Sequence, residues 1–208
     1  VRFACILNDI THVAGRTGMG AVMGAKRLKA IAVRGSRPPE VADREKILAL
    51  NRFMHQNYKE ISKHWRYGTG SDMTGYEAAG NMPIRNFRGG RFPGVEQISA
   101  KTLCGKYLEK MDNCYGCPIR CKRVVKLQEP YAVDPVYGGP EYETLAALGS
   151  NCGIDNLEAL MKANELCNRY GIDTISTGVA ISFAMECAEK GLLSREETDG
   201  LDLTFGNA

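Results

Sequence analysis

The chain has 208 residues, with 27 lysines and arginines against 24 aspartates and glutamates, which gives a formal net charge of +3. Hydrophobic residues at 44% and charged residues at 25% are ordinary values for a globular protein, so they exclude a wholly disordered chain. The small positive excess argues against nucleic acid or a membrane surface as partner, no apolar run is long enough to span a bilayer, and no signal peptide opens the sequence. These features predict a soluble cytoplasmic protein with a core of its own.

Both ends of the sequence read as cut. The chain starts with Val1 in a segment that already resembles a strand, and residues 205–208 close no element. We therefore expect a piece of a longer polypeptide.

Residues 1–37 alternate strand-like runs, at 3–7 and 30–33, with a glycine-rich stretch at 15–20. Pro38 and Pro39 end this region, because neither proline nor the residue before it favours continued regular structure. The sequence therefore predicts one domain over 1–37 and a second over 38–208.

From Pro38 onward the chain reads as mainly helical. Apolar residues recur at helical spacing from Ile47 to Trp65, residues 68–98 read as loop with one short helix, and residues 99–110 read as a helix. Residues 141–150 resemble a short helix. The fold class expected is thus mainly α, a multihelical domain preceded by a more strand-rich segment.

Two longer helices are predicted in the last third. Asp155 and Glu158 fit a capping box, and Gly171 suits the residue after the end of that helix. Another helix begins near Thr174, and Ser194 with Glu197 predicts the start of one more. The apolar faces expected are Leu157, Leu160, Met161, Asn164 and Cys167 on the first helix, and Val179, Ala180, Phe183, Ala184 and Cys187 on the second.

The strongest chemical signal is the crowding of Cys114, Cys117 and Cys121 on a short loop with glycine and proline. Thiolates at this spacing can converge on one inorganic centre, and iron–sulfur clusters take such ligands with a fourth from elsewhere in the chain. Thiols without any bound metal are a further alternative. Structural zinc is the main alternative, although no histidine pair stands at the spacing it needs. The scattered cysteines, among them Cys152, Cys167 and Cys187, are expected to pack as small hydrophobic residues.

Basic residues surround this motif, at Arg120, Lys122, Arg123 and Lys126. They predict either a solvated basic face or a positive collar that offsets cluster charge and attracts an acidic electron-transfer partner.

Three further segments combine an ordinary structural interpretation with a functional one. In residues 138–144, Glu141 and Glu143 suit the start of a helix, or one of them with Tyr142 faces a pocket and transfers protons. In residues 168–174, Asp173 is a helix cap or accepts hydrogen bonds from an amino-heterocycle such as a pterin edge. In residues 15–20, backbone amides and Arg16 suit a phosphate, although one glycine-rich loop is weak evidence.

Taken in order, these segments resemble the aldehyde:ferredoxin oxidoreductase family, whose members carry tungsten or molybdenum on a bis-pyranopterin. The likeness runs through residues 14–26, the three-cysteine motif, residues 141–144 and residues 171–174, and it extends over essentially the whole chain. It implies that residues 1–37 end a β-rich pterin-binding domain. Residues 38–208 would be most of a multihelical middle domain that carries the cysteine motif.

The resemblance also implies roles for single residues. Cys114, Cys117 and Cys121 match three ligands of a [4Fe–4S] cluster, whose fourth cysteine lies later in the family's polypeptide than Ala208. Glu143, preceded by Tyr142, matches the glutamate beside the metal. The cofactor-binding matches are Ala14, Gly15 and Arg16 for the pterin phosphates and their bridging magnesium, and Asn168, Ile172, Asp173 and Thr174 for a pterin edge. Asn168 departs from the aspartate usual in the family.

The function implied is the oxidation of an aldehyde to a carboxylic acid, with electrons leaving through the cluster to ferredoxin or a ferredoxin-like subunit. The alternative from a different class is a cluster-carrying electron-transfer subunit without its own substrate site. A zinc-stabilised interaction module is a third option. A second copy of the chain is a further candidate partner, and an anaerobic cytoplasm is the expected setting.

Overall fold

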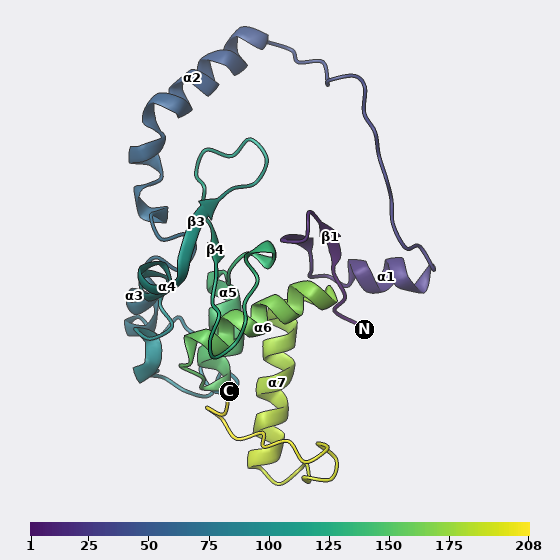
Figure 1. Ribbon diagram of the computed structural model, residues 1–208, viewed down its shortest axis with the longest axis vertical. Helices are drawn as coiled ribbons and strands as arrows, with labels where there is room; N and C mark the ends of the chain where they lie inside the picture. Colours follow the sequence, from purple (N-terminus) through teal and green to yellow (C-terminus); the bar gives the residue numbers. More distant parts are fainter.

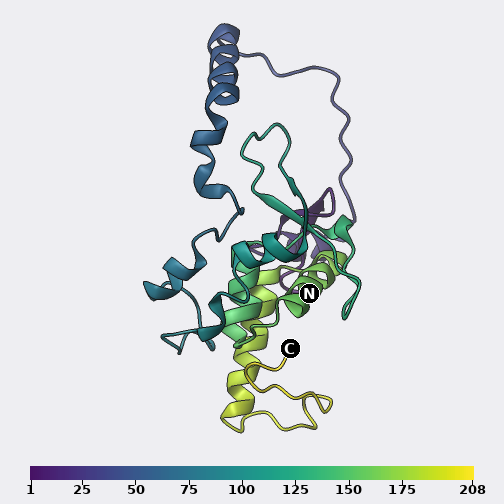
Figure 2. The same ribbon diagram turned by 60° about the vertical axis from the view of Figure 1, so that its left-hand side comes forward.

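The computed structural model describes residues 1–208 and confirms the mainly helical fold class (Figures 1 and 2). The chain begins with a short antiparallel hairpin of β1 (Ile6–Asn8) and β2 (His12–Ala14), in which Ile6 lies opposite Ala14. Helix α1 (Met19–Ala25) follows. Gly20 of α1 lies directly on the Ala4 carbonyl, where any Cβ would overlap the backbone.

Helices dominate the rest of the chain, and one further hairpin interrupts them. The elements in order are α2 (Arg44–Ile61), η1 (Lys63–Trp65), α3 (Met73–Ala78), η2 (Pro93–Val95), α4 (Ala100–Tyr107), β3 (Leu108–Asp112), β4 (Lys122–Val125), η3 (Pro135–Tyr137), α5 (Tyr142–Thr144), η4 (Leu145–Gly149), η5 (Ser150–Cys152), α6 (Leu157–Tyr170) and α7 (Thr174–Glu189). None of these helices combines the length and the apolar character needed to cross a membrane.

The core combines side chains of α6 and η4 with side chains of α3, η2, α4, β4 and the loops between them. Each fully buried valine, leucine, isoleucine, phenylalanine or methionine side chain removes apolar surface from water, which stabilises the fold by about 1.5–3 kcal/mol. The cluster consists of Met73, Met82, Ile84, Phe92, Val95, Ile98, Leu103, Val125, Val133, Leu145, Leu148, Leu157, Leu160 and Met161.

Small residues, rather than large ones, carry the contact between α7 and η4. A Cβ on Gly178 would lie 2.5 Å from the carbonyl carbon of Ala147, so the two backbones approach as closely as glycine allows. The buried residues of α7 are Gly178, Ser182 and Met185, whereas Phe183 is 62% exposed. The predicted apolar face of this helix was therefore wrong, while that of α6 is confirmed for Leu157, Leu160, Met161, Asn164 and Cys167, all of them buried.

Helix α2 stands apart from the main body in both ribbon views, at the end of an extended segment (Figures 1 and 2). It forms where the apolar spacing predicted it and begins at Asp43, whose side chain accepts a hydrogen bond from Lys46 N–H, but none of its residues is buried. The strand predicted at 30–33 is absent: Ile31 and Val33 are 72% and 88% exposed and have no partner strand. An extended segment becomes a strand only when another segment pairs with it.

The helix caps differ in part from expectation. Gly171 ends α6 in the left-handed conformation (φ 66°), as predicted, but the residue that begins α6 is Asn156, whose side chain accepts from Ala159 N–H at 3.0 Å. Asp155 therefore does not form the predicted cap. Ser194 and Glu197 do hydrogen-bond to one another, yet only turns follow, because Asp199 (φ 52°) and Gly200 (φ 79°) end the segment after one turn.

The β3–β4 hairpin was not predicted, and it carries the cysteine loop between its strands. The helix expected over 99–110 stops at Tyr107, and the chain continues directly into β3. Asp112 lies opposite Lys122, so the loop of residues 113–121 connects the two strands at this end of the hairpin.

Candidate functional site

The N-terminal segment is joined to the helical body at the turn between α6 and α7. Cys5 N–H donates to the Gly171 carbonyl at 2.7 Å, and Asp173 N–H donates to the Phe3 carbonyl at 3.0 Å. An isolated bridge between Ala4 and Ile172 lies between these bonds. The glycine-rich segment and the Asp173 corner, far apart in the sequence, are thereby brought into contact.

Gly15 and Arg16 lie directly against Asp173. A Cβ on Gly15 would stand 3.0 Å from Asp173 Oδ1 and 3.1 Å from Cys5 Sγ, so a larger residue would have to displace both side chains by a few tenths of an ångström. Arg16 Nη1 lies 3.5 Å from Asp173 Oδ2 and is mostly exposed, whereas the Asp173 side chain is buried. Burial, with the charges of Asp173 and Cys167, raises the pKa of the Cys5 thiol to about 11. Cys5 is therefore a neutral packing residue beneath the corner.

Asp173 also begins α7, which confirms the interpretation of this residue as a helix cap. Its Oδ2 accepts from Ser176 N–H at 2.8 Å and from the Ser176 hydroxyl at 2.6 Å. Oδ1 takes no part in these bonds.

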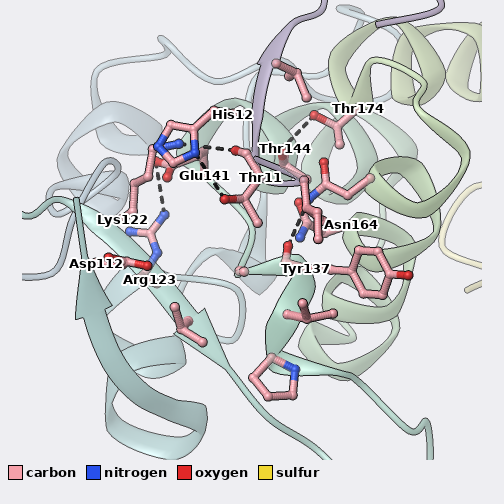
Figure 3. Close-up of a pocket in the computed structure, with 18 of the residues that line it drawn as sticks. Thr11, His12, Asp112, Lys122, Arg123, Tyr137, Glu141, Thr144, Asn164 and Thr174 are labelled. Atoms are coloured by element: carbon pink, nitrogen blue, oxygen red, sulfur yellow. Dashed lines mark hydrogen bonds and ion pairs between the residues drawn. The ribbon is translucent and has the colours of Figure 1, made fainter. Parts of the chain in front are cut away.

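A cavity of about 790 Å³ lies between the tip of the β1–β2 hairpin, the β3–β4 hairpin and the start of α7 (Figure 3). It brings together four predicted cofactor residues, Asn168, Ile172, Asp173 and Thr174. In Figure 3, Thr11, His12 and Lys122 form one side, and Tyr137, Thr144, Asn164 and Thr174 the other. This volume suits a large polar ligand.

Asn168 uses the one group that an aspartate would lack. Its side-chain amide donates to the Tyr137 carbonyl at 2.9 Å. An ionised carboxylate only accepts hydrogen bonds, so it would not fit beside this carbonyl. The amide thus ties α6 to the wall of the cavity.

Tyr142 and Glu143 line a second, neighbouring cavity of about 580 Å³, together with Trp65 and Tyr76. The Tyr76 and Tyr142 rings meet edge to face at 5.3 Å. Burial, and then the charge of Glu143, raises the pKa of the Tyr142 phenol, so this group stays a hydrogen-bond donor. Glu141 lines both cavities and separates them, a placement that its position at a helix start did not reveal.

The cysteine loop holds its three thiols on tight backbone turns. Cys117 N–H donates to the Cys114 carbonyl at 3.0 Å, and Gly116 (φ 69°) and Arg120 (φ 54°) adopt the left-handed conformation. Cys114 is exposed, and Cys117 and Cys121 are half-buried. No group of three or more His, Cys, Asp and Glu side chains meets the spacing for a single metal ion.

Burial, and then the charge of Glu141, raises the pKa of the Cys121 thiol, and the neighbouring Cys117 and Cys114 contribute to the same effect. In its chemistry, the donor set of three thiols on one glycine-containing loop fits an iron–sulfur cluster.

Arg123 is not on a solvated face, so that alternative is wrong for this residue. It is 1% exposed, and its guanidinium donates to the carbonyls of Tyr67, Thr69 and Pro140 at 2.6, 2.7 and 2.6 Å. Burial lowers its pKa, which the charge of Glu141, with Nη2 to Oε2 at 3.7 Å, opposes. The sequence did not predict that Arg123 lies beside Glu141, because a cluster of basic residues gives no sign of which member is buried.

The other cysteine interpretations hold in part. Cys152 and Cys167 are buried, as predicted, and burial raises the pKa of Cys152 to about 12. Cys187 is half-buried.

A solved structure shares the fold. It is described as the active site complex BamBC of benzoyl coenzyme A reductase in complex with 1,5-dienoyl-CoA, and it matches with a TM-score of 0.74 at 22% identity, over 96% of this chain and 32% of that one.

Curated relatives match the whole chain. The tungsten-containing aldehyde ferredoxin oxidoreductases of Thermococcus kodakarensis and Pyrococcus furiosus are each 40% identical over 215 aligned positions, and an aliphatic sulfonate oxidoreductase WOR-like subunit of Pyrococcus furiosus is 34% identical. The chain spans about a third of the length of these relatives (34%, 34% and 33%).

Two family models divide the chain between them. Residues 1–35 match the N-terminal domain of aldehyde ferredoxin oxidoreductase, and residues 48–208 match its domains 2 and 3. With the relatives above, these matches show that the chain belongs to the aldehyde ferredoxin oxidoreductase family.

Proposed function

We propose that the chain is part of a tungsten or molybdenum pterin enzyme that oxidises an aldehyde to a carboxylic acid and passes the electrons through a [4Fe–4S] cluster to ferredoxin. The observation that carries this proposal is the contact of Gly15 and Arg16 with Asp173, a residue that lines the large cavity next to the one that Glu143 lines. A cluster-carrying subunit without its own substrate site would need neither cavity. We also propose that the protein lies in the cytoplasm and that residues 1–37 and 38–208 belong to two different domains.

The residues at the corner suit the polar edges of a pterin. The Ala14 carbonyl and the Gly15 backbone would face the phosphates and their magnesium, and the exposed Arg16 guanidinium supplies positive charge to them. Asp173 keeps Oδ1 as an acceptor for the amino groups of a pterin edge, with Ile172 and Thr174 beside it in the wall. The Asn168 amide orients that wall through the Tyr137 carbonyl.

The oxidation adds one oxygen from water to the aldehyde carbon and releases two electrons and two protons. The bound metal and its pterins supply the redox chemistry. The protein handles protons and orientation: the Glu143 carboxylate takes a proton, and the Tyr142 hydroxyl donates a hydrogen bond to the substrate oxygen. Cys114, Cys117 and Cys121 would hold the cluster through which single electrons leave.

The test is Glu143→Gln in the complete polypeptide. The amide keeps the shape of the side chain and cannot take a proton, so we expect aldehyde oxidation to fall by 10²-fold or more, in the range of general-base removal, while metal and pterin content stay normal. Metal analysis and steady-state kinetics measure the two quantities separately. Near-normal turnover in this variant would remove Glu143 from the proposed role.

A further inference from the structure

The side chain of Arg123 connects the cysteine loop to the segment that carries Tyr142 and Glu143. Arg123 lies in β4, two residues after Cys121, and its Nη2 donates to the Pro140 carbonyl at 2.6 Å and to Thr69 Oγ1 at 3.2 Å. The same Thr69 hydroxyl donates to Glu141 and accepts from Tyr142 N–H at 3.0 Å. One buried network therefore holds residues 140–142.

The guanidinium also approaches the last cysteine of the motif. A Cβ on Gly68 would stand less than 3.0 Å from both the Cys121 carbonyl oxygen and Nη1 of Arg123. Both atoms therefore pack closely against the backbone of Gly68. Gly68 has a φ of +79°, and its lack of a side chain leaves room for this approach. The positive charge is thus held beside the loop and away from water.

The burial of Arg123 beside Glu141 is not explained by a gain in stability alone. The Arg123 side chain is fully buried, its Nε has no hydrogen-bond partner, and its carboxylate partner Glu141 stays 37% exposed at 3.7 Å. An unpaired buried donor lowers stability, and a buried ion pair adds little net stability. Arg123 Nη1 and the Cys121 carbonyl nevertheless lie on the same side of Gly68, and Glu141 stands 3.7 Å from Nη2 of the same guanidinium.

We propose that Arg123 is a positioning residue with two effects: its charge raises the reduction potential of the cluster held by Cys114, Cys117 and Cys121, and its hydrogen bonds hold residues 140–142 so that Glu143 faces the substrate cavity. The inference rests on the proposed cluster. Reduction adds one negative charge to a cluster, and a nearby buried cation stabilises that state, because Coulomb interactions are weakly screened away from water. Glu141 acts on the same cluster with the opposite sign.

The experiment measures the midpoint potential of the cluster by spectroscopically monitored redox titration of the complete enzyme, after iron analysis. Arg123→Gln should favour the oxidised cluster about tenfold, a shift of about 59 mV to more negative potential for a one-electron couple. Glu141→Gln should shift the potential in the positive direction. Arg123→Lys keeps the charge and loses the hydrogen-bonding fork, so its potential should stay near that of the unmodified enzyme while kcat falls.

Lys126→Gln is the matched control, because Lys126 is an exposed cation just after β4 and its charge is screened by water. It should leave the potential unchanged. An iron-replete Arg123→Gln enzyme with an unshifted potential would overturn the inference. If that variant does not assemble, Glu141→Gln decides, since Arg123 keeps its carbonyl partners there; an unshifted or negative result overturns the inference too. Unmodified enzyme without iron would instead refute the proposed function.

Discussion

At the scale of single residues, the contact between the glycine-rich segment and Asp173 depends on the absence of a side chain at Gly15. Gly15 lies against Asp173 and Cys5 at distances that leave no room for a methyl group without displacement of both. The sequence offered only a weak signal here, a glycine-rich loop that lacks the usual phosphate-binding pattern. Its significance comes from Asp173, which stands 158 positions later and meets it through backbone hydrogen bonds of residues 3–5.

Gly15→Ala tests this contact. The added methyl would stand 3.0 Å from Asp173 Oδ1, so we expect the corner to open, with destabilisation of about 1–3 kcal/mol from overpacking and a loss of bound pterin. Gly24→Ala is the control, because a Cβ there meets nothing within 4 Å and should stabilise α1 by up to about 1 kcal/mol. Thermal unfolding and pterin content of the complete enzyme give both results. Full pterin content in Gly15→Ala would contradict the account.

For Asn168 and Arg123, the sequence motifs do not predict the contacts that the side chains make in the fold. The amide of Asn168 could be compared with the family's aspartate from the sequence, but its partner, the Tyr137 carbonyl, depends on how α6 packs against η3. Arg123 looked like one of four basic residues around the cysteines, and only the fold shows that β4 turns it inward.

At the scale of elements, long helices with clear periodicity were predictable and paired segments were not. Helix α6 forms where apolar spacing and Gly171 placed it, and α7 begins at Thr174 as predicted, although it buries a different face. The β3–β4 hairpin depends on pairing across the cysteine loop, and nothing in residues 108–112 alone distinguishes a strand from the end of a helix. Residues 145–149 continue α5 as a π-helix, which brings their backbone close to Gly178 and lies beyond what periodicity indicates.

The start of α6 gives an element-scale prediction. Asn156→Ala removes the side chain that accepts from Ala159 N–H, so it should lower the free energy of unfolding by about 1 kcal/mol. Asp155→Ala, at the exposed neighbouring position that the sequence favoured, should stay within about 0.5 kcal/mol of the unmodified protein. Chemical denaturation compares the two variants. A larger loss in Asp155→Ala than in Asn156→Ala would contradict the cap seen in the structure.

At the scale of the whole molecule, segments far apart in the sequence meet in one region. The N-terminal hairpin, the β3–β4 hairpin and the α6–α7 turn all border the 790 Å³ cavity (Figure 3). Glu141 lines both this cavity and the one that Glu143 lines. Because the motifs occur in the same order as in the aldehyde ferredoxin oxidoreductase family, the sequence predicted that they serve one cofactor site. Their spatial arrangement follows from backbone bonds between residues 3–5 and 171–173, which no local pattern announces.

The most direct test of this account is the content of tungsten, molybdenum, iron, zinc and pterin per chain, measured on the complete polypeptide purified without oxygen. We expect about four irons and one tungsten or molybdenum per chain, with bound pterin. Iron at that stoichiometry without pterin would instead support a cluster-carrying electron-transfer subunit. Zinc without iron would contradict the central claim and return Cys114, Cys117 and Cys121 to a structural role.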